Sequence, residues 1–234
     1  MNILKIFILH IFDIMTLKDE KEQVRKSIYD KLFKEGQSLR PNGDYGKIPD
    51  FKGSDIAADL LATTGEWKNS KTIFCSPDSA QIPVRFLALK ENKNLIMASP
   101  NLEHGYLFLE GNKLNGNEKE AATKEGAFNH CSRFFDFGEK AFAASDDSES
   151  DYYDIVIDMV VEGSVGVDRL GNRIGKGKGF ADREIEDLFN KNLINEDTPL
   201  VTTIHTFQLV ENIPMERHDK KLNMIVTTKD IIRI

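Results

Sequence analysis

Four glycines and three cationic side chains alternate within nine residues in the second half of the chain. Glycine lets the backbone approach a ligand closely and exposes its N–H groups, while lysine and arginine neutralise negative charge. The combination suits a polyphosphate; the alternative is a solvated turn with incidental lysines, and the density of glycines and cations favours the phosphate interpretation. The residues are Gly171, Arg173, Gly175, Lys176, Gly177, Lys178 and Gly179.

The segments on either side of this stretch would position it for anion binding. An apolar, β-branched run from Asp154 to Val161 predicts a buried strand, and a charged helix is expected from about Ala181 to Asn192. A strand that leads through a glycine loop into a helix directs free N–H groups and the positive end of the helix dipole at an anion. The G-x-x-x-G-x-G-x-G spacing is neither a Walker A loop nor the G-x-G-x-x-G of a dinucleotide-binding fold.

The stretch resembles the ATP-binding loop of the 5-formyltetrahydrofolate cyclo-ligase family (5,10-methenyltetrahydrofolate synthetases), which reads roughly G-x-R-L-G-x-G-x-G-Y-Y-D. It is more similar still to the branch called methenyltetrahydrofolate synthetase domain-containing proteins, whose loop also has G-S-V before it and A-D after it. IPDFKG at 48–53 and PDSAQIPVR at 77–85 extend the resemblance. The matching loop residues are Gly171, Arg173, Ile174, Gly175, Gly177, Gly179, Phe180, Ala181 and Asp182.

The resemblance implies roles for individual residues. Arg173, Lys176 and Asp182 would be catalytic: the two cations would neutralise charge during phosphoryl transfer, and Asp182 would contact Mg²⁺. Without the resemblance, Lys21 and Arg25, four residues apart on one helix face, would be an ordinary solvated pair. With it, the expected nucleotide-binding residues are Lys21, Arg25, Gly171, Arg173, Gly175, Lys176, Gly177, Lys178 and Gly179.

Two residues are predicted to contact a folate substrate. Asp50 is the acidic residue nearest to the region where cyclo-ligases are thought to hold the folate, and a turn aspartate that caps its own backbone is an equally good interpretation. Phe180 stands with Ala181 where the family has a tyrosine pair. A hydroxyl group and one aromatic wall of the folate site are therefore missing from this sequence.

Composition limits the class of protein. The 234 residues are 40% hydrophobic and 29% charged, which is ordinary for a soluble globular protein. The net charge of −7 argues against a nucleic-acid-binding surface over the whole molecule, and no aromatic RNA-binding motif is found. Cys75 and Cys131 stand far apart without C-x-x-C, which predicts neither a disulfide framework nor a zinc site and fits a reducing, cytoplasmic location.

The domain organisation is expected to be simple. The apolar run at residues 1–14 is too short for a membrane span and lacks a cleavage site, so we expect a non-core extension followed by a single domain over residues 15–234. Alternating helices and short apolar strands indicate an α/β protein. The resemblance implies the three-layer, open Rossmann-like sheet of the cyclo-ligase type, which is CoA-transferase-like.

Local patterns predict the individual elements. Helices are expected at 18–35, at 54–62 and from the loop at 77–85 to near Asn92. Ser54 is expected to cap the second helix and Ile56 to face the core. Arg85 is expected in the first turn of the third helix, where the helix dipole disfavours a cation, so it should need an anionic partner. Strands are expected at 71–76, 95–99, 106–109, 200–207 and 222–227.

By resemblance the chain is an ATP-dependent cyclo-ligase that converts 5-formyltetrahydrofolate to 5,10-methenyltetrahydrofolate, with ATP going to ADP and phosphate. Its expected partners are ATP, Mg²⁺ and a small-molecule folate, with no membrane and no nucleic acid. Two other classes stay open: an ATP-dependent enzyme on a different formyl- or pterin-like substrate, and a non-enzymatic nucleotide- or RNA-associated protein. A fold and a loop do not fix the substrate, so ADP release with and without 5-formyltetrahydrofolate is the discriminating observation.

Overall fold

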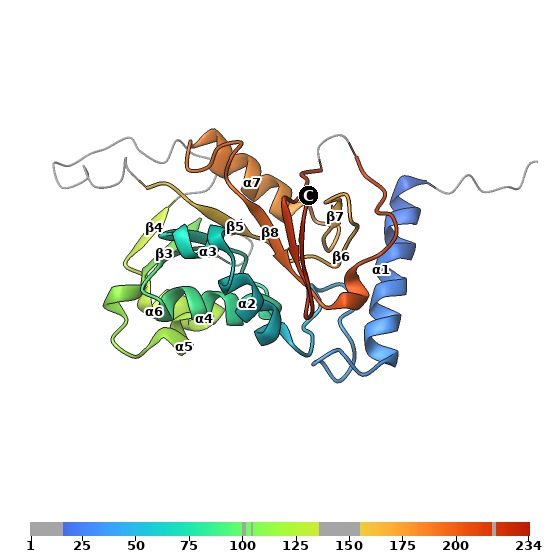
Figure 1. Ribbon diagram of the computed structural model, residues 1–234, viewed down its shortest axis with the longest axis horizontal. Helices are drawn as coiled ribbons and strands as arrows, with labels where there is room; N and C mark the ends of the chain where they lie inside the picture. Colours follow the sequence, from blue (N-terminus) through green and yellow to red (C-terminus); the bar gives the residue numbers. More distant parts are fainter. Residues whose placement is uncertain (1–15, 100–101, 104, 136–154, 217–218) are drawn as a thin grey trace, which may run out of the picture.

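A mostly parallel sheet runs through the computed structural model (Figure 1). Its eight strands follow the order β10-β9-β8-β5-β1-β2-β3-β4, and a separate ribbon pairs β6 with β7. The strands from β9 to β2 are parallel, whereas β10, β3 and β4 are antiparallel to their neighbours. The structure describes residues 16–99, 102–103, 105–135, 155–216 and 219–234. The predicted extension at 1–14 and the start of the strand expected from Asp154 lie outside these ranges.

The elements are short and alternate along the chain. The helices are α1 Leu17–Lys34, α2 Ser54–Ala62, α3 Gly65–Asn69, α4 Ile82–Lys90, α5 Glu118–Ala121, α6 Lys124–His130 and α7 Phe180–Asn190, with 3₁₀ turns η1 Ser79–Gln81, η3 Gly111–Lys113 and η5 Thr206–Gln208. The strands are β1 Thr72–Cys75, β2 Asn94–Ala98, β3 Tyr106–Glu110, β4 Arg133–Phe135, β5 Met159–Val161, β6 Gly166–Val167, β7 Arg173–Ile174, β8 Leu200–Thr203, β9 Met224–Val226 and β10 Ile231–Arg233.

Helices cover both faces of the sheet, which confirms the predicted three-layer α/β fold (Figure 1). Ile73 and Met159 pack on one face with residues of α2, α4 and α6, while Phe74 and Val160 pack on the other with residues of α7. Successive strand residues point to opposite faces. Because both faces are covered, the central strands are continuous apolar runs rather than alternating ones.

Helix α1 lies to one side of these layers, next to the β6–β7 ribbon (Figure 1). Thr16 caps it in a reciprocal capping box with Asp19. Its apolar residues Ile28 and Leu32 pack with Val165, at the entry to the ribbon, in a core of their own. This packing brings the first turns of α1 close to the glycine stretch that follows β7.

The connections that leave the adjacent strands β1 and β5 run toward opposite edges of the sheet. From β1 the chain continues through α4, on one face, to β2; from β5 it continues through α7, on the opposite face, to β8. At such a switch point, a crevice for ligands forms outside the carboxyl ends of the strands. Ser76, directly after β1, and Glu162, directly after β5, both lie at this place.

Three expectations about local structure were wrong. The strand expected over 154–161 is limited, within the described residues, to Met159–Val161; just before it, the Asp158 carboxylate accepts from the amides of Lys71 and Thr72. Helix α2 is capped by Gly53 in the left-handed conformation, so Ser54 is its first helical residue rather than its cap. Ile56, expected in the core, is 50% exposed.

Three further corrections concern two strands and the partners of Arg85. The strand expected over 200–207 ends at Thr203 and is followed by η5, and the final strand β10 was missed. Arg85 is fully buried, yet its partners are backbone carbonyls rather than an anion. Its Nε donates to the oxygen of Ala122 at 2.8 Å, and Nη1 donates to the oxygens of Asp78, at 3.0 Å, and of Ser76.

Candidate active site

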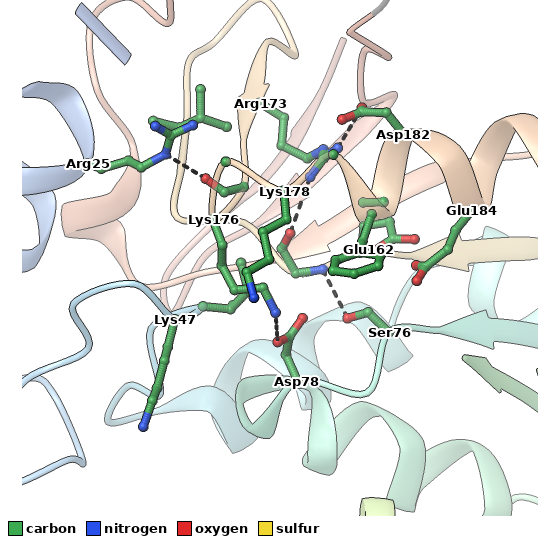
Figure 2. Close-up of a pocket in the computed structure, with 18 of the residues that line it drawn as sticks. Arg25, Lys47, Ser76, Asp78, Glu162, Arg173, Lys176, Lys178, Asp182 and Glu184 are labelled. Carbon is green, nitrogen blue, oxygen red and sulfur yellow. Dashed lines mark hydrogen bonds and ion pairs between the residues drawn. The ribbon is translucent and has the colours of Figure 1, made fainter. Parts of the chain in front are cut away.

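A cavity of about 810 Å³ lies at the carboxyl ends of β1 and β5 (Figure 2). This volume is in the range of sites that bind small molecules. The start of α1, the glycine stretch and the start of α7 form much of its wall. Most of the residues singled out in the sequence line it: Lys21, Arg25, Arg173, Gly175, Lys176, Gly177, Lys178, Gly179, Phe180 and Asp182.

Residues 175–179, here called the cradle segment, line the cavity, and their backbone N–H groups are unpaired among the described residues. Gly177 has φ +86° and Gly179 has φ +63°, conformations that residues with a Cβ rarely adopt. None of the amides of this segment donates a hydrogen bond to another described residue. Gly179 is also the N-cap of α7, without a side-chain cap. Unpaired N–H groups at the positive end of a helix dipole make this segment a candidate anion site.

Cationic side chains surround the cradle segment. Arg25 donates through Nε to the carbonyl oxygen of Gly175 at 2.8 Å, and its guanidinium carbon lies 3.4 Å from the position of a Cβ on Gly177. Lys176 pairs with Asp78 at 3.2 Å, as Figure 2 shows. The structure thus brings α1 and the glycine stretch together across about 150 residues of sequence.

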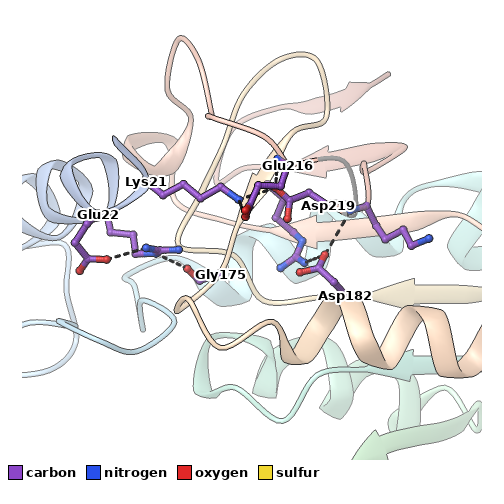
Figure 3. Close-up of polar contacts among 9 residues, drawn as sticks. Lys21, Glu22, Gly175, Asp182, Glu216 and Asp219 are labelled. Carbon is purple, nitrogen blue, oxygen red and sulfur yellow. Dashed lines mark hydrogen bonds and ion pairs between the residues drawn. The ribbon is translucent and has the colours of Figure 1, made fainter. Parts of the chain in front are cut away.

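Lys21 reaches the same region but is held by two carboxylates (Figure 3). Its Nζ lies 2.8 Å from Glu216 and 2.7 Å from Asp219. Burial lowers the pKa of Lys21, but the bonds to Asp219 and Glu216 outweigh burial and the pKa is raised overall. The ammonium group therefore stays charged, with part of its charge already balanced.

Arg173 and Asp182 form a half-buried ion pair at the start of α7. Nη2 of Arg173 lies 2.8 Å from Oδ1 of Asp182, which also accepts from the amide of Lys220 at 3.4 Å. Nη1 of Arg173 is 3.5 Å from the oxygen of Gly163, and Nε has no partner among the described residues. Asp182 is thus already engaged, and nowhere in the described ranges do three or more His, Cys, Asp or Glu side chains gather to hold a metal ion. Contact of Asp182 with Mg²⁺ stays a prediction.

Two predicted site residues lie away from the cavity lining. Gly171 has φ +79°, and a Cβ there would lie 2.4 Å from the carbonyl oxygen of Leu222, so its packing alone explains the glycine. Asp50 is half-buried, and burial raises its pKa; its backbone amide donates to Asp44. Neither residue is retained in the site proposed below.

Sequence reasoning missed the acidic side of the cavity. Asp78 follows β1, Glu162 follows β5, and Glu184 lies in α7; all three line the cavity. Burial raises the pKa of Glu162 well above its ordinary value, and the nearby Glu184 carboxyl raises it further. Burial likewise raises the pKa of Glu184, to about 7. A carboxylate directly after a buried apolar strand was the available signal for Glu162.

The fold and the cavity place the chain among three-layer α/β proteins whose ligand crevice lies at the carboxyl ends of parallel strands. The chain belongs to the 5-formyltetrahydrofolate cyclo-ligase family: the family profile matches residues 17–228. The chain is similar to the methenyltetrahydrofolate synthase domain-containing proteins of Mus musculus, at 33% identity over 215 residues, and Bos taurus, at 31% over 219 residues. Each match covers 91% of this chain, and 54% and 53% of those proteins, so the chain spans about half the length of the curated relatives it matches.

A solved structure supports the fold. The NMR structure of Aquifex aeolicus 5,10-methenyltetrahydrofolate synthetase matches with a TM-score of 0.52 at 21% identity, over 91% of this chain and 92% of that one. In the parts of the chain that are described, no helix combines the length and apolar character needed to cross a membrane.

Proposed function

We propose that this chain is an ATP-dependent 5-formyltetrahydrofolate cyclo-ligase. In this reaction ATP phosphorylates the formyl oxygen and becomes ADP. N10 then attacks the formyl carbon on N5, and the carbon–oxygen bond breaks with loss of phosphate, which gives 5,10-methenyltetrahydrofolate. The observation that carries the proposal is the cradle segment. Its amides, which have no partner in the described part of the chain, lie at the N-terminus of α7 and next to Arg25, in a cavity of small-molecule size. Family membership supplies the substrate class.

The cavity is suited to the phosphates of ATP. The backbone of the cradle segment can approach an anion because Gly177 has no Cβ, and the amides would donate to phosphate oxygens. Arg25 is already oriented by Gly175, so less side-chain freedom is lost when it binds. Lys176, whose present partner is Asp78, could exchange that carboxylate for a phosphate oxygen.

Phosphoryl transfer asks the protein mainly for positioning and charge neutralisation. Arg173 is suited to this role because Asp182 and Gly163 fix its guanidinium group and its Nε is unpaired among the described residues. Phe180 lines the cavity as a flat apolar surface and packs against Arg183, 4.7 Å from the ring centroid. It would contact the folate. Magnesium enters the proposal only as the ion that accompanies the nucleotide phosphates.

The proposal is tested by measuring ADP release from ATP with and without 5-formyltetrahydrofolate, together with formation of the methenyl product by absorbance. Lys176→Gln should reduce the folate-dependent rate at least tenfold, because it removes a cation next to the cradle segment. Lys119→Gln, the same change at an exposed lysine outside the cavity lining, should leave the rate unchanged.

The other outcomes separate the alternative functions. ADP release that depends on another formyl- or pterin-like compound would contradict the cyclo-ligase and favour a related ATP-dependent enzyme. ATP binding without ADP release on any of these compounds would favour a nucleotide-binding protein that is not an enzyme.

A further inference from the structure

Two buried carboxyl groups lie together on one side of the cavity. Glu162, at the end of β5, is 2% exposed, and Glu184, in the second turn of α7, is 5% exposed; both line the cavity. Figure 2 shows the two carboxyl groups close together, on the opposite side of the view from Arg25 and Lys47. Arg25 and Lys47 thus lie apart from this pair, whereas Arg173 and Lys176 border it, paired with Asp182 and Asp78.

Glu162 is held rigidly and one of its polar atoms is unpaired. Its backbone amide donates to the oxygen of Val201 at 2.8 Å, and its carbonyl oxygen accepts from the hydroxyl of Thr202 at 2.7 Å. These bonds fix the residue to the central sheet. Oε1 of Glu162 is buried without a hydrogen-bond partner among the described residues. Buried polar atoms almost always have partners, so an unpaired one that lines a cavity indicates a missing ligand.

The nearby charges decide what kind of ligand fits. The closest cations already have carboxylate partners, since Arg173 pairs with Asp182 and Lys176 with Asp78. A phosphate beside Glu162 and Glu184 would find these two cations already neutralised, and it would oppose the negative charge of either carboxyl group when ionised. The acidic side therefore suits the part of a second substrate that carries no negative charge.

Burial favours the neutral form of this pair. Burial raises the pKa of both carboxyl groups. The charges of Glu184, Asp78 and Asp182 raise the pKa of Glu162 further, against Arg173. Asp78 raises the pKa of Glu184 further, whereas Lys176, Arg173 and a hydrogen bond with Glu162 lower it, and the balance stays above the ordinary value. A protonated carboxyl group offers one O–H donor and one acceptor side by side. Its complement is a group that presents an N–H donor next to an acceptor.

We propose that Glu162, supported by Glu184, binds a nitrogen-containing ring of the second substrate through an edge that presents an N–H donor next to an acceptor. The amide-like edge of a pterin ring is of this kind. The inference rests on the proposed function, because it assigns the cradle segment to the nucleotide and leaves the acidic side to the other substrate.

The test is binding of 5-formyltetrahydrofolate in the absence of nucleotide, measured by calorimetry. Glu162→Met keeps the length of the side chain and removes both polar atoms, so folate should bind at least tenfold more weakly while ATP affinity changes less than threefold. Because the variant also removes an unpaired buried atom, its melting temperature should not fall. Glu162→Gln keeps a donor and an acceptor and should bind folate within threefold of wild type.

Two controls make the result specific. Glu186→Met places the same change on the exposed face of α7 and should alter neither affinity. A ligand pair tests the proposal without any variant: pterin should bind to the wild-type protein at least tenfold more tightly than pterin methylated at N3, which lacks the ring N–H donor.

The outcomes distinguish this inference from the proposed function. Equal folate affinity of wild type and Glu162→Met, equal binding of the two pterins, or a parallel loss of ATP affinity would overturn the ring site. Folate binding that requires Glu162, without folate-dependent ADP release, would support the ring site and refute the cyclo-ligase. A wild-type protein that binds neither folate nor pterin would overturn both.

Discussion

The loop at residues 168–179, which contains the glycine stretch, has two halves that differ in their hydrogen bonding. In the first half, residues 168–174, here called the turn segment, Asp168 is almost completely buried and accepts from the amides of Leu170, Asn172 and Ile213 and from the side chain of Asn172. The carbonyl of Gly171 accepts from the amide of Leu222. The turn segment is therefore tied to the body of the protein on several sides.

In the second half, the cradle segment, the amides are unpaired within the described residues. Its carbonyl oxygens accept from two arginine side chains: Arg25 donates to Gly175, and Arg183 donates to Lys178 and Gly179. A glycine with positive φ is present in each half, at Gly171 and at Gly177. A glycine in such a loop can serve packing against the backbone, as at Gly171, or, as we propose for Gly177, the close approach of a ligand. The neighbours in space decide which of the two applies.

The largest expected effect is that of Gly171→Ala. The new Cβ would lie 2.4 Å from the oxygen of Leu222, in a backbone conformation unfavourable for alanine. We expect the free energy of unfolding to fall by about 2–4 kcal/mol. Urea denaturation measures this, and ATP affinity of the folded fraction should be unchanged. A stable variant that had lost ATP binding would break the comparison.

Asp168→Asn should destabilise the turn segment somewhat less. An asparagine keeps the shape but turns an NH₂ group toward backbone donors, so at least one buried amide loses its acceptor. The expected loss in the free energy of unfolding is about 1.5–3 kcal/mol. The matched control is Asp59→Asn, the same change of charge at an exposed position. Equal melting curves for the two variants would show that the bonds of Asp168 are unimportant.

Gly177→Ala should give the reverse pattern. We expect ATP to bind roughly tenfold more weakly, a change of about 1.4 kcal/mol, because the Cβ would occupy space between the backbone and Arg25. The unfolding free energy should change by no more than about 1 kcal/mol, the cost of a positive φ at a surface loop. Gly116→Ala, at φ +97° with nothing within 4 Å, should show that small cost and normal ATP affinity. Unaltered ATP binding in Gly177→Ala would remove the nucleotide from the cradle segment.

The smallest effect is expected for Glu22→Gln. The Glu22 carboxylate is 71% exposed and lies 2.7 Å from Nη1 of Arg25, where it competes with an anion for that guanidinium group (Figure 3). Removing its charge should tighten ATP binding two- to threefold, about 0.5 kcal/mol, and the gain should shrink at high salt. Asp30→Asn, on the same helix but paired with Lys26, should not affect ATP. Weaker ATP binding in Glu22→Gln would mean that Glu22 orients Arg25 rather than competing for it.

The sequence by itself determined the local elements of this protein. The apolar run that became β1 and the spacing that became α1 predicted both elements to within one or two residues. Local rules sufficed here because backbone preference and apolar periodicity act between residues close in sequence. The glycine stretch was likewise visible from composition alone. Its resemblance to cyclo-ligases gave the family, which the match over residues 17–228 confirmed.

Only the tertiary structure decided what those elements bring together. The pairing of Lys21 with Glu216 and Asp219 joins residues almost 200 positions apart. The meeting of Glu162 with Glu184 depends on α7 crossing the face of the sheet opposite α4. Such contacts follow from strand order, which is set by the packing of distant apolar faces rather than by nearby sequence. For the same physical reason, no spacing rule could separate Gly171, which packs against Leu222, from Gly177, which borders the cavity.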